Sequence, residues 1–468
     1  MFSKARISSL KILSTCILGV TPSVLLTGCS QKETEKERPN FLIIVSDDQR
    51  ADQLSYLGKQ VIPELKTPNI DNIAAQGVYF SNAFVTSPIS CVSRASIATG
   101  RYVSTHGMNG FNTPLKEDVI CNTYHALLRN AGYRTGLFGK WGVGMKGTEK
   151  IFDEMDAWYH QGRYFIKTDT GKIHETEWVA AKAEEFLASD KGEKPFCLTL
   201  CFKSPHHPYQ PDPRDTALFK DVNIPKRYSD TPEAYRNMAP HVMEKSLNRW
   251  CYFDERKDDK TKEKFEKDFL RCVVGLDRAV GKVMASLEKH HLDKNTVVIF
   301  ISDNGYLWGE HGLGGKWLQY EESIHVPIIV KWPQMKKIEK GKVLEQLVLN
   351  IDIAPTLLDM AGVQIPEVMD GKSLLPLMEN RKSEIRSDFF LEHDGVTKVS
   401  NPIPDSYGIR TKDWKYIRYV HVDPEVEEMY DLKNDPYELK NLINDEDYAG
   451  KRDELRKRYN EYKSELSK

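Results

Sequence analysis

A Ser/Pro-rich loop runs into a segment of small residues between Ser87 and Gly100, and it carries side chains that could do nucleophilic chemistry. Ser90 and Cys91 lie where a helix is expected to begin, and the unpaired backbone N–H groups at a helix N-terminus favour an anion. Arg94, one turn further on, adds a fixed positive fork. The stretch could hold a phosphate or sulfate group beside a nucleophile. An ordinary capped helix explains the same Ser and Pro residues equally well.

Two apolar segments end in acidic or amide side chains. Residues 40–45 form a nearly continuous apolar run, typical of a buried parallel strand, and Asp47 and Asp48 follow it. Residues 295–301 form a second such run, followed by Asp303 and Asn304. Open α/β sheets place ligands at the carboxyl ends of their strands, and oxygen donors suit Ca²⁺ or Mg²⁺ better than Zn²⁺. A solvated turn would also accept adjacent acids.

Basic side chains follow other predicted strands. Lys140 comes directly after a short strand over residues 135–139, and His206 follows a buried strand over residues 196–202. The prolines on either side of His206 and His207 stiffen that loop. A lysine here could neutralise an anion and a histidine could donate a proton. Taken alone, Lys140 is better explained as a surface lysine, and His206 is explained equally well as a structural loop residue.

Strands alternate with helical patterns along most of the chain. We therefore expect an α/β fold with a large, mixed, mostly parallel sheet flanked by helices. After about residue 377 the pattern changes to short strands rich in aromatic and β-branched residues, followed by a charged helix over residues 446–466. This predicts a catalytic α/β domain over residues 39–376 and a smaller antiparallel sheet with a helix over residues 377–468.

The N-terminus has the pattern of an export signal. Basic residues precede a mostly apolar stretch that is too short for a membrane span, and it ends in the sequence Leu-Thr-Gly before Cys29. This resembles a bacterial lipobox. Residues 1–28 are predicted to be a lipoprotein signal peptide, with lipid attached at Cys29 and a charged tether over residues 29–38. We expect a protein anchored by lipid to the bacterial envelope, facing the periplasm or the cell surface.

Composition excludes some other classes of protein. The 468 residues carry a net charge of −2, and this balance gives no reason to expect a nucleic-acid partner. Six cysteines remain beyond Cys29, and their pairing cannot be read from the sequence. Cys197 and Cys201 lie in a predicted strand and are expected to pack in the core.

The order of these motifs resembles the type I sulfatases of the alkaline-phosphatase superfamily over nearly all of the mature chain. The family motif Cys/Ser-x-Pro/Ala-x-Arg matches residues 90–94, followed by Thr99 and Gly100. Further matching stretches are Asp47-Asp48, Gly139-Lys140-Trp141, Pro205-His206-His207-Pro208, Ser302-Asp303-Asn304-Gly305, Tyr320-Glu321-Glu322-Ser323 and Met429-Tyr430-Asp431-Leu432 with Asp435-Pro436.

The resemblance implies roles for individual residues. Ser90 would be converted to formylglycine (3-oxoalanine) by a maturation enzyme and would supply the nucleophile. Arg94 would orient it, and His206 would protonate the leaving alcohol. The lysines, Lys140 and Lys316, would neutralise the charge of the sulfate group. The implied Ca²⁺ ligands are Asp47, Asp48, Asp303, Asn304 and the modified Ser90. Cys91 falls on the variable position of the motif.

The sequence departs from the family pattern at two positions. Val92 stands where Pro or Ala is usual, and Gly142 stands where many members have a histidine that handles the formylglycine proton. Another side chain or water must take over that function, and His106 and His311 are the candidate side chains. With His207, they are also candidate substrate contacts.

The expected substrate is a sulfated carbohydrate, such as a glycosaminoglycan or mucin oligosaccharide. The alternatives are a phosphomonoester, phosphodiester or phosphonate hydrolase of the same superfamily, or a non-catalytic glycan-binding lipoprotein. The sugar, the sulfate position and exo or endo action are not readable from the sequence.

Overall fold

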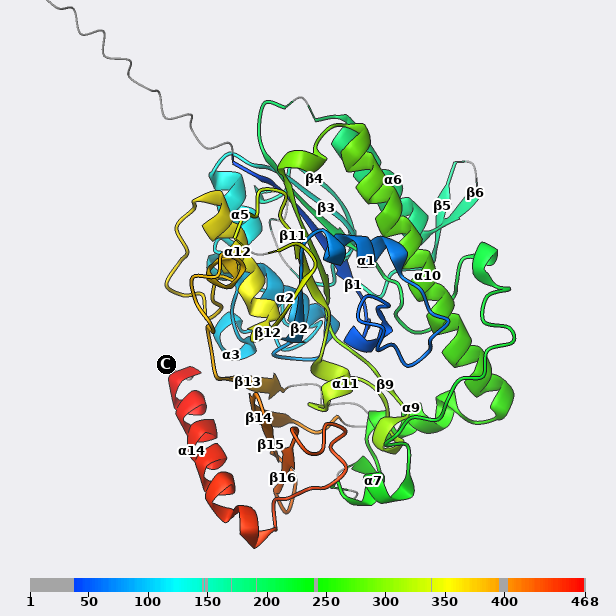
Figure 1. Cartoon of the computed structure of the whole chain (residues 1–468), viewed down its shortest axis with the longest axis vertical. Helices are drawn as coiled ribbons and strands as arrows, with labels where there is room; N and C mark the ends of the chain where they lie inside the picture. Colours follow the sequence, from blue (N-terminus) through cyan, green and yellow to red (C-terminus); the bar gives the residue numbers. More distant parts are fainter. Residues whose placement is uncertain are drawn as a thin grey trace, which may run out of the picture. The chain divides into compact units, whose positions relative to one another are not determined.

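An eight-stranded sheet forms the centre of the fold in this computed structural model, which describes residues 38–144, 147, 150–169, 171–190, 192–239, 243–337, 339–394 and 403–466 (Figure 1). Its strand order is β12 (Lys342–Leu349), β2 (Val78–Phe84), β11 (Ile328–Lys331), β8 (Thr296–Ser302), β1 (Asn40–Ser46), β7 (Phe196–Cys201), β3 (Arg134–Lys140) and β4 (Glu154–Trp158). Within this sheet β11 runs antiparallel to both its neighbours, and the remaining pairs are parallel. The predicted α/β class is confirmed.

Helices cover both faces of the sheet (Figure 1). Alternate residues of β1 point to opposite sides, so Phe41 and Ile43 pack with one helix layer and Leu42 and Ile44 with the other. Burial on both faces explains the unbroken apolar run of this strand. The first layer consists of α2 (Ser90–Thr99), α5 (Tyr124–Asn130) and α12 (Ile353–Ala361), and the second of α1 (Pro68–Ala75), α6 (Glu175–Ala188) and α10 (Asp259–Lys289).

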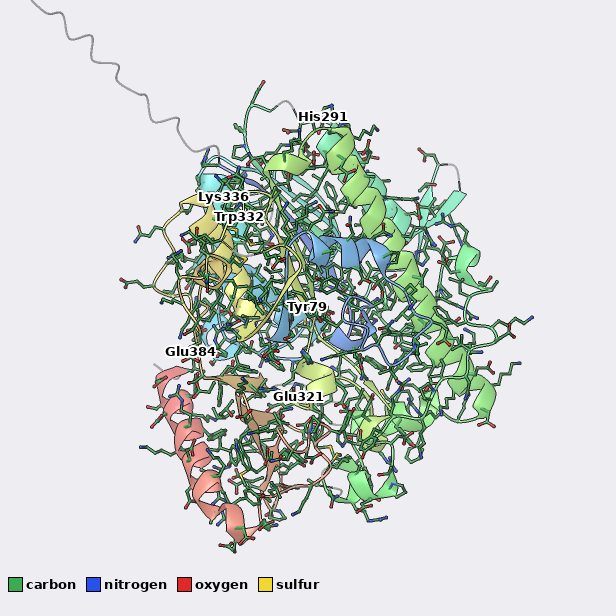
Figure 2. The ribbon with its side chains drawn as sticks, in the orientation of Figure 1. Tyr79, His291, Glu321, Trp332, Lys336 and Glu384 are labelled. Carbon is green, nitrogen blue, oxygen red and sulfur yellow. The ribbon has the colours of Figure 1, made fainter. Side chains whose placement is uncertain are left out.

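A four-stranded antiparallel sheet follows near the C-terminus, as predicted. It contains β13 (Asp388–His393), β14 (Ser406–Thr411), β15 (Trp414–Tyr419) and β16 (Val426–Asp431), with α14 (Ala449–Leu466) packed against it. Glu321 of α11 (Glu321–Ile324) pairs with Arg410 at 3.0 Å and Lys415 at 2.8 Å, and Figure 2 shows it where the two sheets meet. Residues 38–468 form one compact unit. The proposed boundary at residue 377 stays a prediction.

Shorter elements connect these layers. They are α3 (Val103–His106), α4 (Glu117–Ile120), α7 (Pro232–Arg236), α9 (Leu247–Glu255), α13 (Leu375–Met378), the hairpin of β5 (Phe165–Thr168) and β6 (Gly171–His174), and the pair β9 (Leu307–Trp308) and β10 (Gly314–Gly315).

Cys197 and Cys201 are buried and free, which confirms their expected place in the core. The predicted signal peptide and Cys29 lie outside the described residues. In the part of the chain that is described, every helix is too short or too polar to cross a membrane.

The register of the central strands brings four polar strand ends to one edge. Ser46 pairs with Ser302, so the acids that follow β1 and β8 start at the same level. Cys201 pairs with Val45 on one side and with Gly139 on the other. The segments after β8, β1, β7 and β3 therefore leave the sheet side by side, which is the usual place of a site in open α/β folds.

Gly139 allows β3 to approach β7 at this edge. Its φ is +101°, and a Cβ added there would lie 2.1 Å from the backbone oxygen of Cys201. We expect Gly139→Ala to lower the free energy of unfolding by several kcal/mol, roughly 2–4, because backbone atoms must move apart and Lys140 follows directly. Thermal or urea unfolding of the purified variant measures this loss.

Gly58→Ala is the matched control. Gly58 also has a positive φ of +63°, but a Cβ added there meets nothing within 4 Å. Only the conformational strain of about 1 kcal/mol is expected for it. Equal losses for the two variants would contradict the close-approach argument.

Candidate active site

Ser90 is the first residue of α2, and its hydroxyl lies at the meeting point of three strand-end segments. Its Oγ donates to Asp47 Oδ1 at 3.0 Å or to Asn304 Oδ1 at 3.2 Å, and it accepts from Lys316 Nζ at 2.9 Å. The backbone N–H groups of the first turn of α2 add positive potential at the same place. Ser90 is 3% exposed, so these contacts form in a largely water-free environment.

Three buried carboxylates surround this hydroxyl. Asp47 and Asp48 follow β1, and Asp303 follows β8, as the sequence predicted. The Asp48 N–H donates to Asp303 Oδ1 at 3.1 Å, which ties the two segments together. Asp48 adopts a left-handed backbone conformation with φ of +65°, an uncommon and costly choice for a residue other than glycine. The chain turns sharply there and directs both acids to the site.

Three cations balance the three carboxylates. Arg94 Nε contacts Asp303 Oδ2 at 2.8 Å, and its Nη2 lies 3.3 Å from Asp47 Oδ2. Lys140 forms an ion pair with Asp47, and Lys316 forms one with Asp48. Lys316 is positioned by its neighbours: its carbonyl accepts from Asn248 of α9 at 2.6 Å, and the next backbone N–H, that of Trp317, donates to Pro88 at 3.2 Å. Elements far apart in the sequence therefore supply the balancing charge.

Burial and the mutual charges set the protonation of these groups. Burial alone would raise the pKa of Asp47, but Lys140, His206, Arg94 and Lys316 hold it well below its ordinary value. Burial raises the pKa of Asp48, and it raises that of Asp303 to about 6. Burial lowers the pKa of Lys140, whereas for Lys316 the nearby carboxylates outweigh burial and raise it. The site thus contains one firmly ionised carboxylate and two whose charge depends on their partners.

The oxygen donors at this edge fit a hard cation. One oxygen each of Asp47 and Asp48 and one ring nitrogen of His206 lie within 4.8 Å of one another. Asp48 Oδ2 is buried and accepts no hydrogen bond from the described residues. The Asn304 amide donates to Asp48 Oδ1 at 2.6 Å, which turns its own oxygen toward Ser90. Converging carboxylate and amide oxygens are the donor set that Ca²⁺ prefers.

His206 presents one ring nitrogen to this cluster. Its Nδ1 contacts the backbone oxygen of His207, and because a carbonyl only accepts, Nδ1 carries the proton. Its Nε2 lies 3.8 Å from Asp48 Oδ2. Burial, followed by Lys140 among the neighbouring charges, lowers the pKa of His206 well below its ordinary value. The free structure therefore favours a neutral ring with an unprotonated Nε2.

A cavity of about 220 Å³ opens over this cluster. The sequence-predicted residues that line it are Asp48, Ser90, His206, His207 and Lys316. Sequence reasoning did not identify the rest of the lining, although two of these residues, Phe111 and Trp250, are large aromatic side chains that remain about half exposed. The additional lining residues are Ile89, Phe111, Gln161, Trp250, Cys251, Asp254, Glu255, Tyr306 and Trp317.

The structure places two of the candidate substrate contacts, His106 and His311, away from this cavity. His106 is buried and bonds Ser96 Oγ at 3.0 Å, and His311 is buried and stacks on Tyr320 at 4.7 Å between ring centroids. Neither lines the cavity or contacts Ser90. Both rings therefore belong to the interior packing, and neither is in position to replace the histidine that is usual at Gly142.

Gly142 itself lies beside α2. Its φ is +73°, its N–H donates to Trp158 at 3.0 Å, and a Cβ added there would lie 3.6 Å from that of Cys91. A side chain at this position would start next to the first turn of α2. In the described structure the side-chain nitrogen that bonds the Ser90 hydroxyl belongs to Lys316.

Comparison with known protein families identifies the class of protein. Residues 39–363 match the model of the sulfatase family, and residues 309–465 match the C-terminal model of N-sulphoglucosamine sulphohydrolase. The chain belongs to the sulfatase family, and it is a sulfuric ester hydrolase.

Among curated relatives, an N-acetylglucosamine-6-O-sulfatase of Bacteroides thetaiotaomicron is 28% identical, and the match covers 94% of this chain and 89% of the relative. An arylsulfatase of Clostridium perfringens is also 28% identical, over 90% of this chain and 93% of the relative. A solved structure of a protein in complex with its substrate D-glucosamine-2-N,6-O-disulfate superposes with a TM-score of 0.77 at 27% identity, over 92% of this chain and 98% of that chain. A phosphonate monoester hydrolase of Agrobacterium radiobacter shares the fold, with a TM-score of 0.76 at 22% identity over 92% of this chain and 96% of that chain.

Cys91 is next to Ser90 in the sequence but faces the interior. It is 0% exposed, and burial raises the pKa of its thiol to about 12. Because the thiolate is the reactive form, we expect iodoacetamide to leave Cys91 unmodified in the native protein and to alkylate the exposed Cys121. Peptide mass spectrometry reads both sites, and the unfolded protein, in which both thiols should react, is the control. Rapid alkylation of native Cys91 would contradict this placement.

Proposed function

We propose that this protein hydrolyses sulfate esters of carbohydrates, using a formylglycine derived from Ser90 and Ca²⁺. The observation that carries the proposal is the position of Ser90 Oγ, which lies within hydrogen-bond distance of Asp47, Asn304 and Lys316 at once. A nucleophile placed there is next to the oxygen donors for a cation and next to a positive charge. The proposed Ca²⁺ ligands are Asp47, Asp48, Asp303, Asn304 and the modified Ser90.

Other residues of the site have separate roles in the proposed reaction. Lys140 and Lys316 neutralise the charge that develops on the sulfate oxygens, and because they are preorganised and buried, little reorganisation is needed. Arg94 fixes the first turn of α2 by contacts with the carbonyl of Lys140 and with Asp303. A Ca²⁺ held by the proposed ligands would polarise a sulfate oxygen, and a formylglycine at position 90 would supply, as its hydrate, a hydroxyl nucleophile and a second hydroxyl for release of sulfate.

His206 is placed to protonate the leaving oxygen. Its Nδ1 is held by the carbonyl of His207, so the ring can present Nε2 to the cavity. Lys140 and Lys316 are among the charges that lower its pKa. A negative sulfate group in the cavity opposes both cations, so substrate binding favours the protonated ring that a general acid requires.

The relatives support a sugar as the alcohol. One curated relative is an N-acetylglucosamine-6-O-sulfatase. One protein of similar structure was solved in complex with its substrate, D-glucosamine-2-N,6-O-disulfate. The cavity fits such a group, because Phe111, Trp250 and Trp317 offer apolar ring faces while Asp254 and His207 offer polar contacts. The arrangement suits a single sugar ring bound above the catalytic cluster.

The proposal extends to maturation and location. A formylglycine-generating enzyme must act on Ser90, which the first turn of α2 buries, so we infer that modification precedes complete folding. We further propose export, with a lipid at Cys29 that anchors the protein to the bacterial membrane, in the periplasm or at the cell surface. This part depends on the N-terminal sequence pattern alone.

The central test is the activity of the matured protein on matched esters. We expect protein coexpressed with a formylglycine-generating enzyme to show the aldehyde mass at Ser90 and to hydrolyse 4-nitrophenyl sulfate and glucosamine 6-sulfate. Removal of Ca²⁺ with EGTA should reduce turnover at least 100-fold, since metal-assisted charge stabilisation is worth several kcal/mol, and added Ca²⁺ should restore it. Released sulfate is measured by ion chromatography.

Two controls keep this test specific. Ser90→Ala, which cannot be converted, should bind Ca²⁺ more weakly and show no turnover, whereas Cys91→Ala should retain the aldehyde at Ser90. Preferential hydrolysis of 4-nitrophenyl phosphate or of a phosphonate monoester would assign the protein to the other hydrolase activity of the fold. An aldehyde at position 91 would refute the proposed register.

His206→Ala separates proton donation from binding. Because an alkoxide leaves poorly and a nitrophenolate leaves well, we expect kcat on glucosamine 6-sulfate to fall about 100-fold or more and kcat on 4-nitrophenyl sulfate to fall less than about 10-fold. His207→Ala is the matched control from the same cavity and should change the two rates by similar factors. Equal losses on both esters for His206→Ala would contradict a general-acid role.

A further inference from the structure

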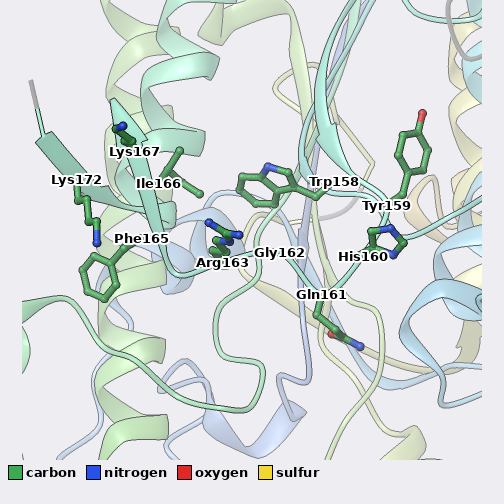
Figure 3. Close-up of a pocket in the computed structure, with 10 residues that line it drawn as sticks. All are labelled: Trp158, Tyr159, His160, Gln161, Gly162, Arg163, Phe165, Ile166, Lys167 and Lys172. Atoms are coloured by element: carbon green, nitrogen blue, oxygen red, sulfur yellow. The ribbon is translucent and has the colours of Figure 1, made fainter. Parts of the chain in front are cut away.

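A second and larger cavity, of about 860 Å³, lies beside the hairpin of β5 and β6. Figure 3 shows its lining, which comes from the end of β4, from the segment that follows it and from the hairpin. We call this cavity the hairpin cleft. Its lining residues include Gln161, which also lines the catalytic cavity, and the two cavities share no other lining residue.

The cleft has a one-sided charge. Arg163, Lys167, Lys172 and His160 line it and are exposed, and among its described lining residues there is no acid. Lys167 and Lys172 face each other directly in the antiparallel register of β5 and β6. Like charges at such a position repel one another, and neither lysine forms an ion pair with a described residue. The positive charges are therefore available to a negatively charged ligand.

Aromatic side chains form the rest of the wall. Trp158, at the end of β4, and Phe165, at the start of β5, lie on opposite sides of the cleft in Figure 3, with Arg163 between them. Trp158 packs on Trp178 at 5.2 Å between ring centroids, which fixes the indole in place. Gly162 lies close to the same ring, since a Cβ added there would be 3.0 Å from it. Flat aromatic faces beside cations are suited to a sugar ring that carries acidic groups.

The cleft is connected to the catalytic cavity by hydrogen bonds as well as by Gln161. The carbonyl of Gln161 accepts from Lys203 Nζ at 2.9 Å, and Tyr164 donates to the carbonyl of His206 at 2.6 Å. The carbonyl of Trp158 accepts from the N–H groups of Trp141 and Gly142 at 3.0 Å each. The segment from Trp158 to Tyr164 therefore forms a wall common to the cleft and to the loops that present Lys140 and His206.

We propose that the hairpin cleft binds an anionic sugar unit, bearing sulfate or carboxylate, that neighbours the sugar whose sulfate ester lies in the catalytic cavity. The saccharide chain would cross Gln161, with its acidic group between Arg163 and the lysine pair and its ring against Trp158. The inference depends on the proposed sulfatase activity toward carbohydrates only for the orientation of the chain. It assigns to the protein a preference for acidic oligosaccharides over isolated sulfated monosaccharides.

The test compares an ester that fills only the catalytic cavity with saccharides long enough to enter the cleft. In the matured enzyme, sulfated tetrasaccharides from heparin and from chondroitin sulfate are used as inhibitors of 4-nitrophenyl sulfate hydrolysis. For the variant Arg163→Gln/Lys167→Gln/Lys172→Gln we expect the inhibition constant of at least one tetrasaccharide to rise about 10-fold or more, because charge-assisted contacts are lost. The kcat and KM for 4-nitrophenyl sulfate should stay within 2-fold of the wild-type values.

Lys336→Gln/Lys337→Gln is the matched control. Both lysines are exposed, and Figure 2 shows Lys336 on the side of α12, away from the hairpin labelled in Figure 1. We expect unchanged inhibition constants for it. Equal effects of the two variants, or no effect of either with both tetrasaccharides, would overturn the proposal. An effect of the cleft variant on 4-nitrophenyl sulfate as large as that on the tetrasaccharides would also overturn it, since the cleft would then act on the catalytic cavity itself.

Direct binding distinguishes a failure of the cleft from a failure of the catalytic proposal. Isothermal titration of the same tetrasaccharides into the full chain needs no turnover, and it should show binding that the cleft variant weakens and that rising salt weakens further. Binding without any sulfate hydrolysis would retain the cleft and refute the proposed activity. Hydrolysis of sulfated sugars with tetrasaccharide binding equal in wild type and cleft variant would retain the activity and refute the cleft.

Discussion

The structure depends on a balance of three buried carboxylates and three buried cations at one edge of the central sheet. Asp47, Asp48 and Asp303 face Arg94, Lys140 and Lys316 with almost no exposure to water. Removing six charges from water is expensive, and a well-packed apolar cluster of the same volume would serve stability as well or better. Stability alone therefore does not explain the arrangement. Its effect is to hold oxygen donors and positive charges in fixed positions around Ser90.

The fold supplies that rigidity through strand register. Since Ser46 pairs with Ser302 and Cys201 pairs with both Val45 and Gly139, the four segments that carry the charges begin at nearly one level. A shift of one residue in any of these pairs would turn a charged side chain to the opposite face. Strands buried on both faces resist such a shift, because apolar residues on each side are already packed. The continuous apolar runs of the sequence therefore hold the strand register that brings the polar side chains together.

Much of this could be predicted from the sequence, and the limits have physical causes. Polar residues directly after apolar runs, such as Asp47 and Asp303, are positioned by local strand geometry, so their meeting at one sheet edge follows from the fold class. The role of Lys316 came from the family resemblance, because this residue follows only the two-residue strand β10 and is placed by contacts with α9 and with the loop before α2. The interior positions of His106 and His311 could not be predicted, because sequence position does not show whether a ring faces a cavity or packs inside. The other lining residues include Trp250 and Asp254 of α9 and Gln161 of the segment after β4. Their positions depend on tertiary contacts, so no local sequence pattern predicts that they line the cavity.

The segment from Trp158 to Tyr164 contacts the loops of Lys140 and His206 and also lines the hairpin cleft. The backbone carbonyl of Trp158 accepts hydrogen bonds from Trp141 and Gly142, which follow Lys140, and the carbonyl of Gln161 accepts one from Lys203. Tyr164 of the same segment donates to the carbonyl of His206. Side chains of this segment meanwhile line the hairpin cleft. Main-chain groups thus fix the catalytic loops while side chains remain free to vary. A substitution of Arg163 or Lys167 changes the charge of the hairpin cleft and removes none of these backbone contacts. Under our proposal, the preference for a neighbouring sugar can therefore change while the buried charge balance stays intact.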